Sequence, residues 1–302
     1  VYTQVNNQDS KGELFMKQIK PEGKRQNFHV IPHFLIYNPE FGEKRILFQM
    51  ALANNMMLKW NPEKPPILYN TNLLVRQMSF SQNYNSSGIN EQVKKFMKLI
   101  EDKGYVKKVA SPIKQLTLYN VPNENTEENL FLQKKHYGII YNFEFLYLLR
   151  LHKTNSMPYN TRIWNVLLVL AYLRYNIIMR VSEDFNSKKN RKKRPETYVK
   201  TYDDIGKELG LHRTTIEKCV KVLDEAGIIY HEQLFKTLPG TDRVVYSRIA
   251  FTNKYKYDGT QEYRLDSNYD YKKEIEEIKL QLKPYGEFGK ATNASSDLEN
   301  LD

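Results

Sequence analysis

The stretch TYDDIGKELGLHRTTIEKCVKVLDEAGII, residues 201–229, carries the clearest structural pattern in this chain of 302 residues. Thr201 followed three residues later by Asp204 is a capping-box pattern, which predicts the start of a helix. Gly210 is expected to end that helix, because glycine adopts the positive φ of a helix C-terminus without a steric cost. A second helix is predicted over residues 213–226. The stretch therefore predicts two helices joined by a tight turn.

The apolar residues of this stretch recur at helical spacing, and a hairpin pattern follows them. Ile205 and Leu209 share one face of the first helix. A turn is predicted at residues 238–242, with a returning strand from Arg243 to Phe251. Helix, turn, helix and hairpin in this order predict a winged helix-turn-helix, whose second helix faces a DNA groove. An ordinary pair of amphipathic helices is the alternative. The buried stripe expected of the second helix is Ile216, Cys219, Val220 and Leu223.

The same order of elements is predicted once more, upstream. Residues 101–106 (EDKGYV) align with residues 224–229 (DEAGII). A short helix is expected from Thr71 to Met78, and a hairpin over residues 105–121. Two diverged modules in tandem explain this recurrence, with an α/β accessory domain as the alternative for the first. The alignment places these residues opposite the stripe of the second module: Val93, Phe96, Met97 and Ile100.

Two shorter matches extend the repeat towards the N-terminus. Arg45-Ile46-Leu47 resembles Arg162-Ile163-Trp164, and each triplet opens an apolar segment. Asn27-Phe28 likewise resembles Asn142-Phe143. We therefore expect an α+β protein of two tandem winged helix-turn-helix domains, with a C-terminal helix and a disordered tail. The expected divisions are an N-terminal polar arm at 1–26, the first winged-helix domain at 27–121, a linker at 122–135, the second winged-helix domain at 136–257, and the C-terminal helix and acidic tail at 258–302.

Length and composition agree with a globular protein. A chain of 302 residues, 40% of them hydrophobic, is long enough for two domains with separate cores. No apolar run approaches the roughly 20 residues that span a bilayer, so no membrane partner is expected. The lone cysteine, Cys219, excludes an internal disulfide, and a reducing cytoplasm is the expected location.

Charge is the second informative property of the chain. The formal net charge is +11, yet residues 258–302 hold eleven acidic and six basic residues, so that residues 1–257 carry the excess. Such an excess attracts a polyanion and strengthens binding through counterion release. The densest basic cluster, which could also be a solvated loop without a fixed partner, consists of Lys188, Lys189, Arg191, Lys192, Lys193 and Arg194.

Catalytic patterns are not evident in the sequence. There is no G-x-x-x-x-G-K-[ST] phosphate loop, and the His-x-His and His-x-x-Arg patterns of DNA-cleaving and DNA-joining enzymes are also missing. Helix capping and solvent exposure explain the acidic pair Asp203-Asp204 better than metal chemistry does. We therefore expect a protein without enzymatic activity, cofactor or metal.

Two winged-helix modules in one basic chain of this size resemble the plasmid replication initiators that bind repeated origin sequences. The residues that carry the resemblance are the stretch at 201–229 and INEQVKKFMKLIEDKGYV at 89–106, and it covers roughly residues 27–257. The resemblance implies a second module that reads the major groove, and a first module that touches DNA and mediates dimerisation. It also implies double-stranded DNA, a homodimer and host replication proteins as partners.

The candidate DNA-binding residues follow from this arrangement. Arg213, Thr214 and Lys218 are placed to face the groove, whereas Thr215 and Lys221 suit phosphates. His212 at the cap position suits either capping or a phosphate contact, and Arg243 on the wing could enter the minor groove. The corresponding residues of the first module are Asn90, Gln92, Lys95 and Lys98.

Three other functions use the same fold. A transcriptional regulator of a mobile element would bind DNA with the same helix. A winged helix can also bind protein, although that function favours an uncharged or acidic face on the second helix. An accessory protein of primosome loading or conjugation is a further alternative.

Overall fold

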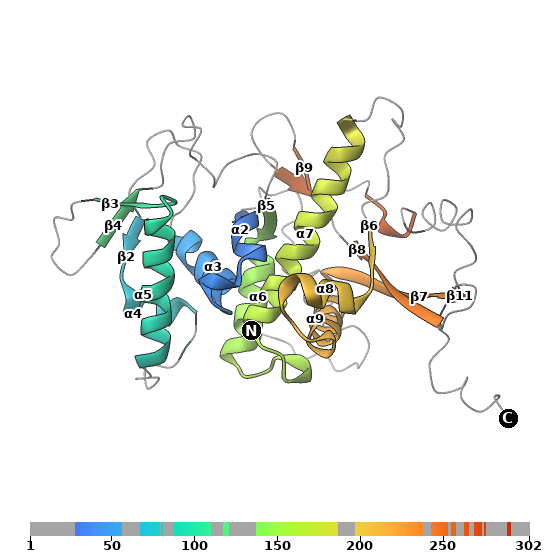
Figure 1. Ribbon diagram of the computed structural model, residues 1–302, viewed down its shortest axis with the longest axis horizontal. Coiled ribbons are helices and arrows are strands. Elements are labelled where there is room, and N and C mark those ends of the chain that lie inside the picture. The colour runs from blue at the N-terminus through green and yellow to red at the C-terminus, as the bar shows by residue number, and fades with distance from the viewer. Residues whose placement is uncertain are drawn as a thin grey trace, which may run out of the picture. The chain divides into compact units, whose positions relative to one another are not determined.

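The protein is a mixed α+β structure, seen in a computed structural model that describes residues 28–55, 67–78, 80, 87–109, 117–120, 137–186, 197–237, 243–252, 255–257, 263–265, 269–273, 275 and 289–290 (Figure 1). These residues form two compact units, which we call the first unit (residues 28–175) and the second unit (residues 176–290). Among the described residues, no helix is long and apolar enough to cross a membrane.

The first unit contains most of the helices. Its elements are β1 (Phe28–Pro32), α2 (His33–Tyr37), the 3₁₀ helix η1 (Pro39–Phe41), α3 (Arg45–Asn55), β2 (Ile67–Tyr69), α4 (Thr71–Gln77), α5 (Ser87–Asp102), β3 (Lys107–Val109), β4 (Thr117–Asn120), β5 (Tyr137–Tyr141), α6 (Asn142–Lys153), the 3₁₀ helix η2 (Pro158–Asn160) and the start of α7 (Ile163–Asn186).

The second unit is built around an antiparallel sheet. Its elements after α7 are β6 (Thr197–Lys200), α8 (Tyr202–Leu209), α9 (Arg213–Glu225), β7 (Ile229–Thr237), β8 (Arg243–Phe251), β9 (Tyr255–Tyr257), β10 (Tyr263–Leu265) and β11 (Gly289–Lys290). Residues 271–273 and 275 are helical, and the remainder of the expected C-terminal helix lies outside the described residues, as do the expected N-terminal arm and most of the acidic tail.

The order of elements occurs twice along the chain. Strand, helix, 3₁₀ helix, helix, strand, helix, helix, strand, strand describes both β1 to β4 and β5 to β8. The sheets repeat as well, because the strand order β2-β4-β3 in the first unit has the same connectivity as β6-β8-β7 in the second. All of these pairs are antiparallel. The recurrence seen in the sequence is therefore also a recurrence of strand pairing.

The two short sequence matches fare differently. Arg45 begins α3, and Arg162 immediately precedes α7, so this match joins equivalent helix starts. The match of Asn27-Phe28 with Asn142-Phe143 is wrong, because Phe28 begins a strand whereas Asn142 begins a helix. The counterpart of β1 is β5. Each of these strands is followed directly by a helix. The two-residue match therefore aligned the start of β1 with the start of α6, one element after its true counterpart β5.

A β-ribbon links the two copies of the repeat within the first unit. β1 pairs antiparallel with β5, with Val30 opposite Ile139. β5 also lies against α7, because a Cβ atom on Gly138 would fall 2.6 Å from the carbonyl oxygen of Ala171. The compact units accordingly divide the chain inside α7. The expected linker at 122–135 lies outside the described residues.

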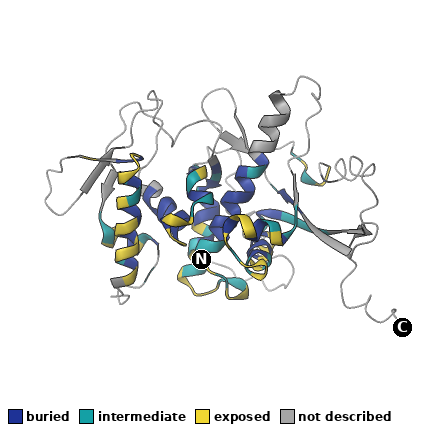
Figure 2. Ribbon diagram, in the orientation of Figure 1, coloured by how far each residue is buried: buried dark blue, intermediate teal, exposed yellow. Residues whose placement is uncertain are grey.

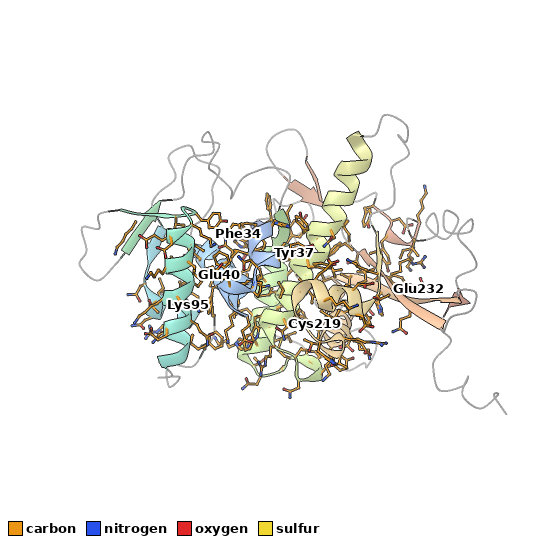
Figure 3. The ribbon with its side chains drawn as sticks, in the orientation of Figure 1. Phe34, Tyr37, Glu40, Lys95, Cys219 and Glu232 are labelled. Carbon is orange, nitrogen blue, oxygen red and sulfur yellow. The ribbon has the colours of Figure 1, made fainter. Side chains whose placement is uncertain are left out.

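The core of the first unit includes the middle of α7. Every residue from 166 to 175 of this helix is buried, as expected for a core helix and not for a surface helix with one apolar stripe. The α5 stripe predicted from the repeat, Val93, Phe96, Met97 and Ile100, is buried. Aromatic packing joins α2 to the segment that follows α5, where the rings of Phe34 and Tyr105 stack with centroids 3.7 Å apart. Phe34 is labelled in Figure 3.

Two buried arginines satisfy polar groups inside the first unit. Arg45 donates to the carbonyl oxygens of Leu35, of Ile36 at 2.8 Å and of Gly42 at 3.0 Å, and so closes the C-terminus of α2. Arg174 on α7 donates to Glu144 on α6 at 2.6 Å. Burial raises the pKa of Glu144, and the charge of Arg174 opposes that rise.

In the second unit, α8 begins and ends at the residues that the sequence predicts. Thr201 caps α8 by accepting from the Asp204 amide at 3.1 Å, and Gly210 ends the helix with φ of +68°. The predicted buried residues Ile205 and Leu209 on α8 are buried, and so is the complete α9 stripe, Ile216, Cys219, Val220 and Leu223. Burial raises the pKa of the Cys219 thiol to about 12, as expected of a packing residue (Figure 3).

A close backbone approach fixes the turn between α8 and α9. The Leu211 amide donates to the Gly206 carbonyl at 2.9 Å. A Cβ atom on Gly206 would lie 2.5 Å from the Leu211 carbonyl oxygen, which is closer than real Cβ contacts. Only glycine therefore fits at position 206 unless the turn moves.

We expect the Gly206→Ala variant to lose about 1–3 kcal/mol of unfolding free energy, because the added methyl group overpacks the contact with the turn. Chemical denaturation would measure the loss. Lys207→Ala, on the exposed side of the same helix, is the matched control and should change stability by less than about 0.5 kcal/mol. Equal stabilities of the two variants would contradict the close contact.

Candidate nucleic-acid interface

The second helix of the pair, α9, is anchored on one face and exposed on the other. Its buried stripe packs into the second unit, and Leu211 in the turn is half-buried. The exposed face carries Thr214, Lys218 and Lys221, spaced as one stripe of a helix (Figure 2). Arg213 is exposed at the first position of the helix, and Thr215 is half-buried. Five of the predicted DNA-binding residues thus lie on or beside one exposed face of α9.

Two acidic residues moderate the charge of this face. Asp203 on α8 lies 3.6 Å from the Arg213 guanidinium, and both side chains are more than half exposed. Glu217 lies 2.9 Å from the Lys221 ammonium, one helical turn away. Exposed pairs of this kind contribute about 0–1 kcal/mol, so a phosphate or base edge can replace either carboxylate at little cost. Among the described residues, Lys218 has no carboxylate within 4 Å, and so it carries the least screened charge of the helix.

His212 caps α9, which confirms the capping prediction. Its Nδ1 accepts from the Thr214 amide at 3.3 Å and lies 2.9 Å from the Thr214 hydroxyl. A neutral ring that accepts through Nδ1 carries its proton on Nε2. Because His212 is exposed at the N-terminus of a helix, that Nε2–H could donate to an anion there. The phosphate contact of His212 stays a prediction.

The part of the β7–β8 hairpin that is predicted to be a wing, residues 234–237 and 243–247, is described only in its backbone. Arg243 begins β8, opposite Thr237 at the end of β7, and nothing further is described of its side chain. The predicted turn at 238–242 and the basic cluster from Lys188 to Arg194 lie outside the described residues. Their roles in DNA binding stay predictions.

The candidate residues of the first unit lie on α5 but do not form one group. Gln92, Lys95 and Lys98 are exposed along one side of the helix (Figure 3). The side-chain oxygen of Gln92 accepts from the Lys44 ammonium at 3.1 Å. The side-chain oxygen of Asn90 is buried, which leaves it poorly placed for a ligand outside the protein. The exposed lysines are therefore the stronger candidates.

A half-buried histidine to which no sequence pattern points supports the helix pair. His231 on β7 accepts or donates through Nε2 to the Tyr202 hydroxyl of α8 at 2.7 Å, and its amide donates to Asp224 near the end of α9 at 3.2 Å. Burial, aided by the charge of Lys221, lowers the pKa of His231 to about 4. The histidine thus connects both helices to the sheet. No sequence signal reveals this contact, because it depends on how three elements meet.

The remaining chemistry of the described residues is sparse. No three His, Cys, Asp or Glu side chains of that part of the chain gather as ligands of a metal ion. No protein family, curated protein or solved structure matches this chain. The exposed face of α9 is therefore assessed from its own geometry and charge.

The pKa of His231 makes stability depend on pH. The unfolded chain takes up a proton near the ordinary pKa of 6.5, whereas the folded protein resists protonation down to about pH 4. Stability should therefore fall as the pH falls from 6.5 towards 4. Burial raises the pKa of Asp224 to about 6, and this contribution has the opposite sign in the same range.

The His231→Gln variant isolates the contribution of the histidine. We expect the wild-type protein to lose about 1–2 kcal/mol of stability relative to this variant between pH 7 and pH 5, measured by denaturant unfolding. The contribution of Asp224 to the pH dependence of stability is the same in both proteins, and it cancels in their difference. A stability difference that stays constant across this range would contradict a half-buried histidine that stays neutral in the folded protein.

Proposed function

We propose that the second unit is a winged helix-turn-helix that binds double-stranded DNA through α9. The observation that carries the proposal is the exposed stripe of Thr214, Lys218 and Lys221, with Arg213 at the helix start, on a helix whose opposite face is fully buried. A helix anchored in this way and followed by a β-hairpin suits insertion into a major groove. Lysine and arginine supply the phosphate and base-edge contacts.

The first unit contributes a second module in this proposal. Its strand connectivity β2-β4-β3 repeats that of the second unit, and its helix α5 exposes Lys95 and Lys98. Two such modules would contact two successive stretches of duplex and would lengthen the site. Such an arrangement would match the tandem winged-helix layout that the resemblance to plasmid replication initiators implies. We therefore propose binding to repeated origin sequences, in the cytoplasm and without enzymatic activity, with a homodimer and host replication proteins as further partners.

The symmetry of the DNA site distinguishes initiation from repression. Selection of bound sequences from random duplex DNA would reveal it. Directly repeated sites are expected for an initiator, whereas a palindrome would favour a transcriptional regulator. Failure to enrich any duplex would contradict both and would favour a protein-binding winged helix.

Substitutions on α9 test the interface with the selected duplex. Arg213→Ala should weaken binding of the cognate site by about 1–3 kcal/mol and relax preference at one base pair, and Lys218→Ala should weaken binding and lower its salt dependence. Gel shifts at several salt concentrations measure both effects. Lys207→Ala removes the same charge from the exposed side of α8 and serves as the matched control.

The Asp203→Asn variant tests the same interface independently. Asp203→Asn removes the carboxylate next to Arg213 and should strengthen binding to scrambled duplex, because less negative charge faces the phosphates. Combined with Arg213→Ala, the gain should shrink if the arginine contacts DNA. Unchanged binding by both the Arg213 and Lys218 variants, to cognate and scrambled duplex alike, would exclude α9 as the interface.

A further inference from the structure

The connection between α6 and α7 is a fixed loop with an unusual backbone. At the end of α6, the Ser156 amide donates to the Leu151 carbonyl at 2.8 Å and the Asn155 amide to the His152 carbonyl at 3.1 Å. These are the two hydrogen bonds of a Schellman motif, with Asn155 in the left-handed conformation at φ of 52°. Thr161 closes the next turn through its hydroxyl, which donates to the Pro158 carbonyl at 2.7 Å. The loop is therefore held by its own backbone.

Tyr159 is the residue that capping does not explain. Its φ of 55° and ψ of 20° are left-handed, a conformation that is sterically unfavourable for a bulky side chain. Asn160 follows at φ of 54°, but asparagine tolerates this region far better. Unfavourable backbone conformations of this kind concentrate at binding sites, where function retains them. A glycine or asparagine at position 159 would relieve the conflict.

The strained backbone places an aromatic side chain at the surface. Tyr159 is 43% exposed, one of three large apolar side chains that are exposed among the described residues. The α6–α7 connection is drawn mostly exposed in Figure 2. Leu146, another of the three, lies on α6 one and two turns before the exposed Arg150 and Lys153.

The sequence on both sides of Tyr159 is basic. Residues 145–182 contain no acidic residue. Arg162 follows Tyr159 and is 63% exposed, with its guanidinium over the Trp164 ring and 3.8 Å from Glu43. Arg150 and Lys153 in the last turn of α6 also favour the helix dipole, which gives them a structural role as well. Arg162 and Tyr159 lie outside α6, so the dipole of this helix does not explain their presence.

We propose that the α6–α7 surface, defined by Arg150, Lys153, Tyr159 and Arg162, binds single-stranded nucleic acid. An exposed aromatic ring and several exposed cations on one connection supply the groups that bind single strands, in which unstacked bases lie on the ring and phosphates meet the cations. Bases inside a duplex are stacked on each other and do not offer their faces in this way. The proposal goes beyond duplex binding by α9, because the surface belongs to the first unit and takes a different ligand.

The Tyr159→Asn variant separates binding from folding. Asparagine accepts the left-handed conformation, so we expect the variant to unfold at an equal or higher denaturant concentration than the wild type. The same variant should bind a fluorescent oligothymidylate about 5- to 100-fold more weakly, as loss of one stacked base predicts. Tyr159→Phe keeps the ring and should bind as the wild type does. A tyrosine with a purely structural role would instead lose stability without a specific loss of binding.

Charge and duplex controls complete the test. Arg162→Ala should weaken oligothymidylate binding, whereas Lys103→Ala, which removes one charge just after the end of α5, should not. Lys218→Ala on α9 should retain oligothymidylate binding, so that failure of the α9 interface and failure of this surface are distinguishable. Equal binding of oligothymidylate by Tyr159→Asn and the wild type would overturn the proposal. So would a Tyr159→Asn defect confined to duplex DNA.

Crosslinking of the wild-type protein tests the proposal without relying on a variant that could fail to fold. An oligonucleotide carrying 5-iodouracil crosslinks to aromatic side chains that stack on it when illuminated. We expect the crosslinked peptide to contain Tyr159, identified by mass spectrometry. Crosslinks that map only to other parts of the chain would contradict the proposal.

Discussion

The contact between Gly206 and the Leu211 carbonyl sets the geometry on which the proposed interface depends. The direction in which α9 leaves α8 follows from the three-residue turn at 210–212. One backbone hydrogen bond holds that turn against α8, and the absence of a side chain on Gly206 leaves room for it. Gly210 adds the left-handed conformation that reverses the chain. Two glycines with different physical roles therefore define how the exposed face of α9 is presented. The polar residues of that face can vary without altering its direction.

Each of the two units contains a buried ion pair. In the first unit, Glu144 and Arg174 form an ion pair with almost no exposure, and in the second, the fully buried Arg248 on β8 pairs with Glu232 on β7 (Figure 3). Replacing a buried pair with apolar residues is often neutral for stability, whereas removing one partner is costly. Such a pair can favour one arrangement over others, because a different strand register or helix contact would leave a charge buried without its partner. Glu232 and Arg248 are directly opposite in the β7–β8 register, which agrees with that role.

The local elements could be predicted from the sequence, and the long-range contacts could not. The α9 stripe was predictable because apolar residues at helical spacing have one structural explanation, and Gly210 because few residues accept its φ. The pairing of β1 with β5 joins strands more than 100 residues apart, and a periodicity of two within each strand does not identify its partner. Tyr159 carries no sequence signal at all, since nothing distinguishes it from the other 21 tyrosines until its backbone conformation is seen. The Arg213–Asp203 pair was missed for a similar reason, because it depends on the angle between two helices.

The acidic residues that pair with cations of α9, Asp203 on α8 and Glu217 on α9 itself, have a consequence for specificity. Asp203 and Glu217 each sit within hydrogen-bonding or ion-pairing distance of a cation that the proposed interface uses. In the unbound protein they lower the positive potential, and so they weaken binding to arbitrary duplex, which depends on charge alone. A correct site can replace each carboxylate with a phosphate or a base edge of better geometry, and it then recovers the attraction. A wrong site recovers less, because its groups do not meet both cations together. The carboxylates would thus increase the ratio of specific to non-specific affinity, the quantity that determines selection of a site among many competitors.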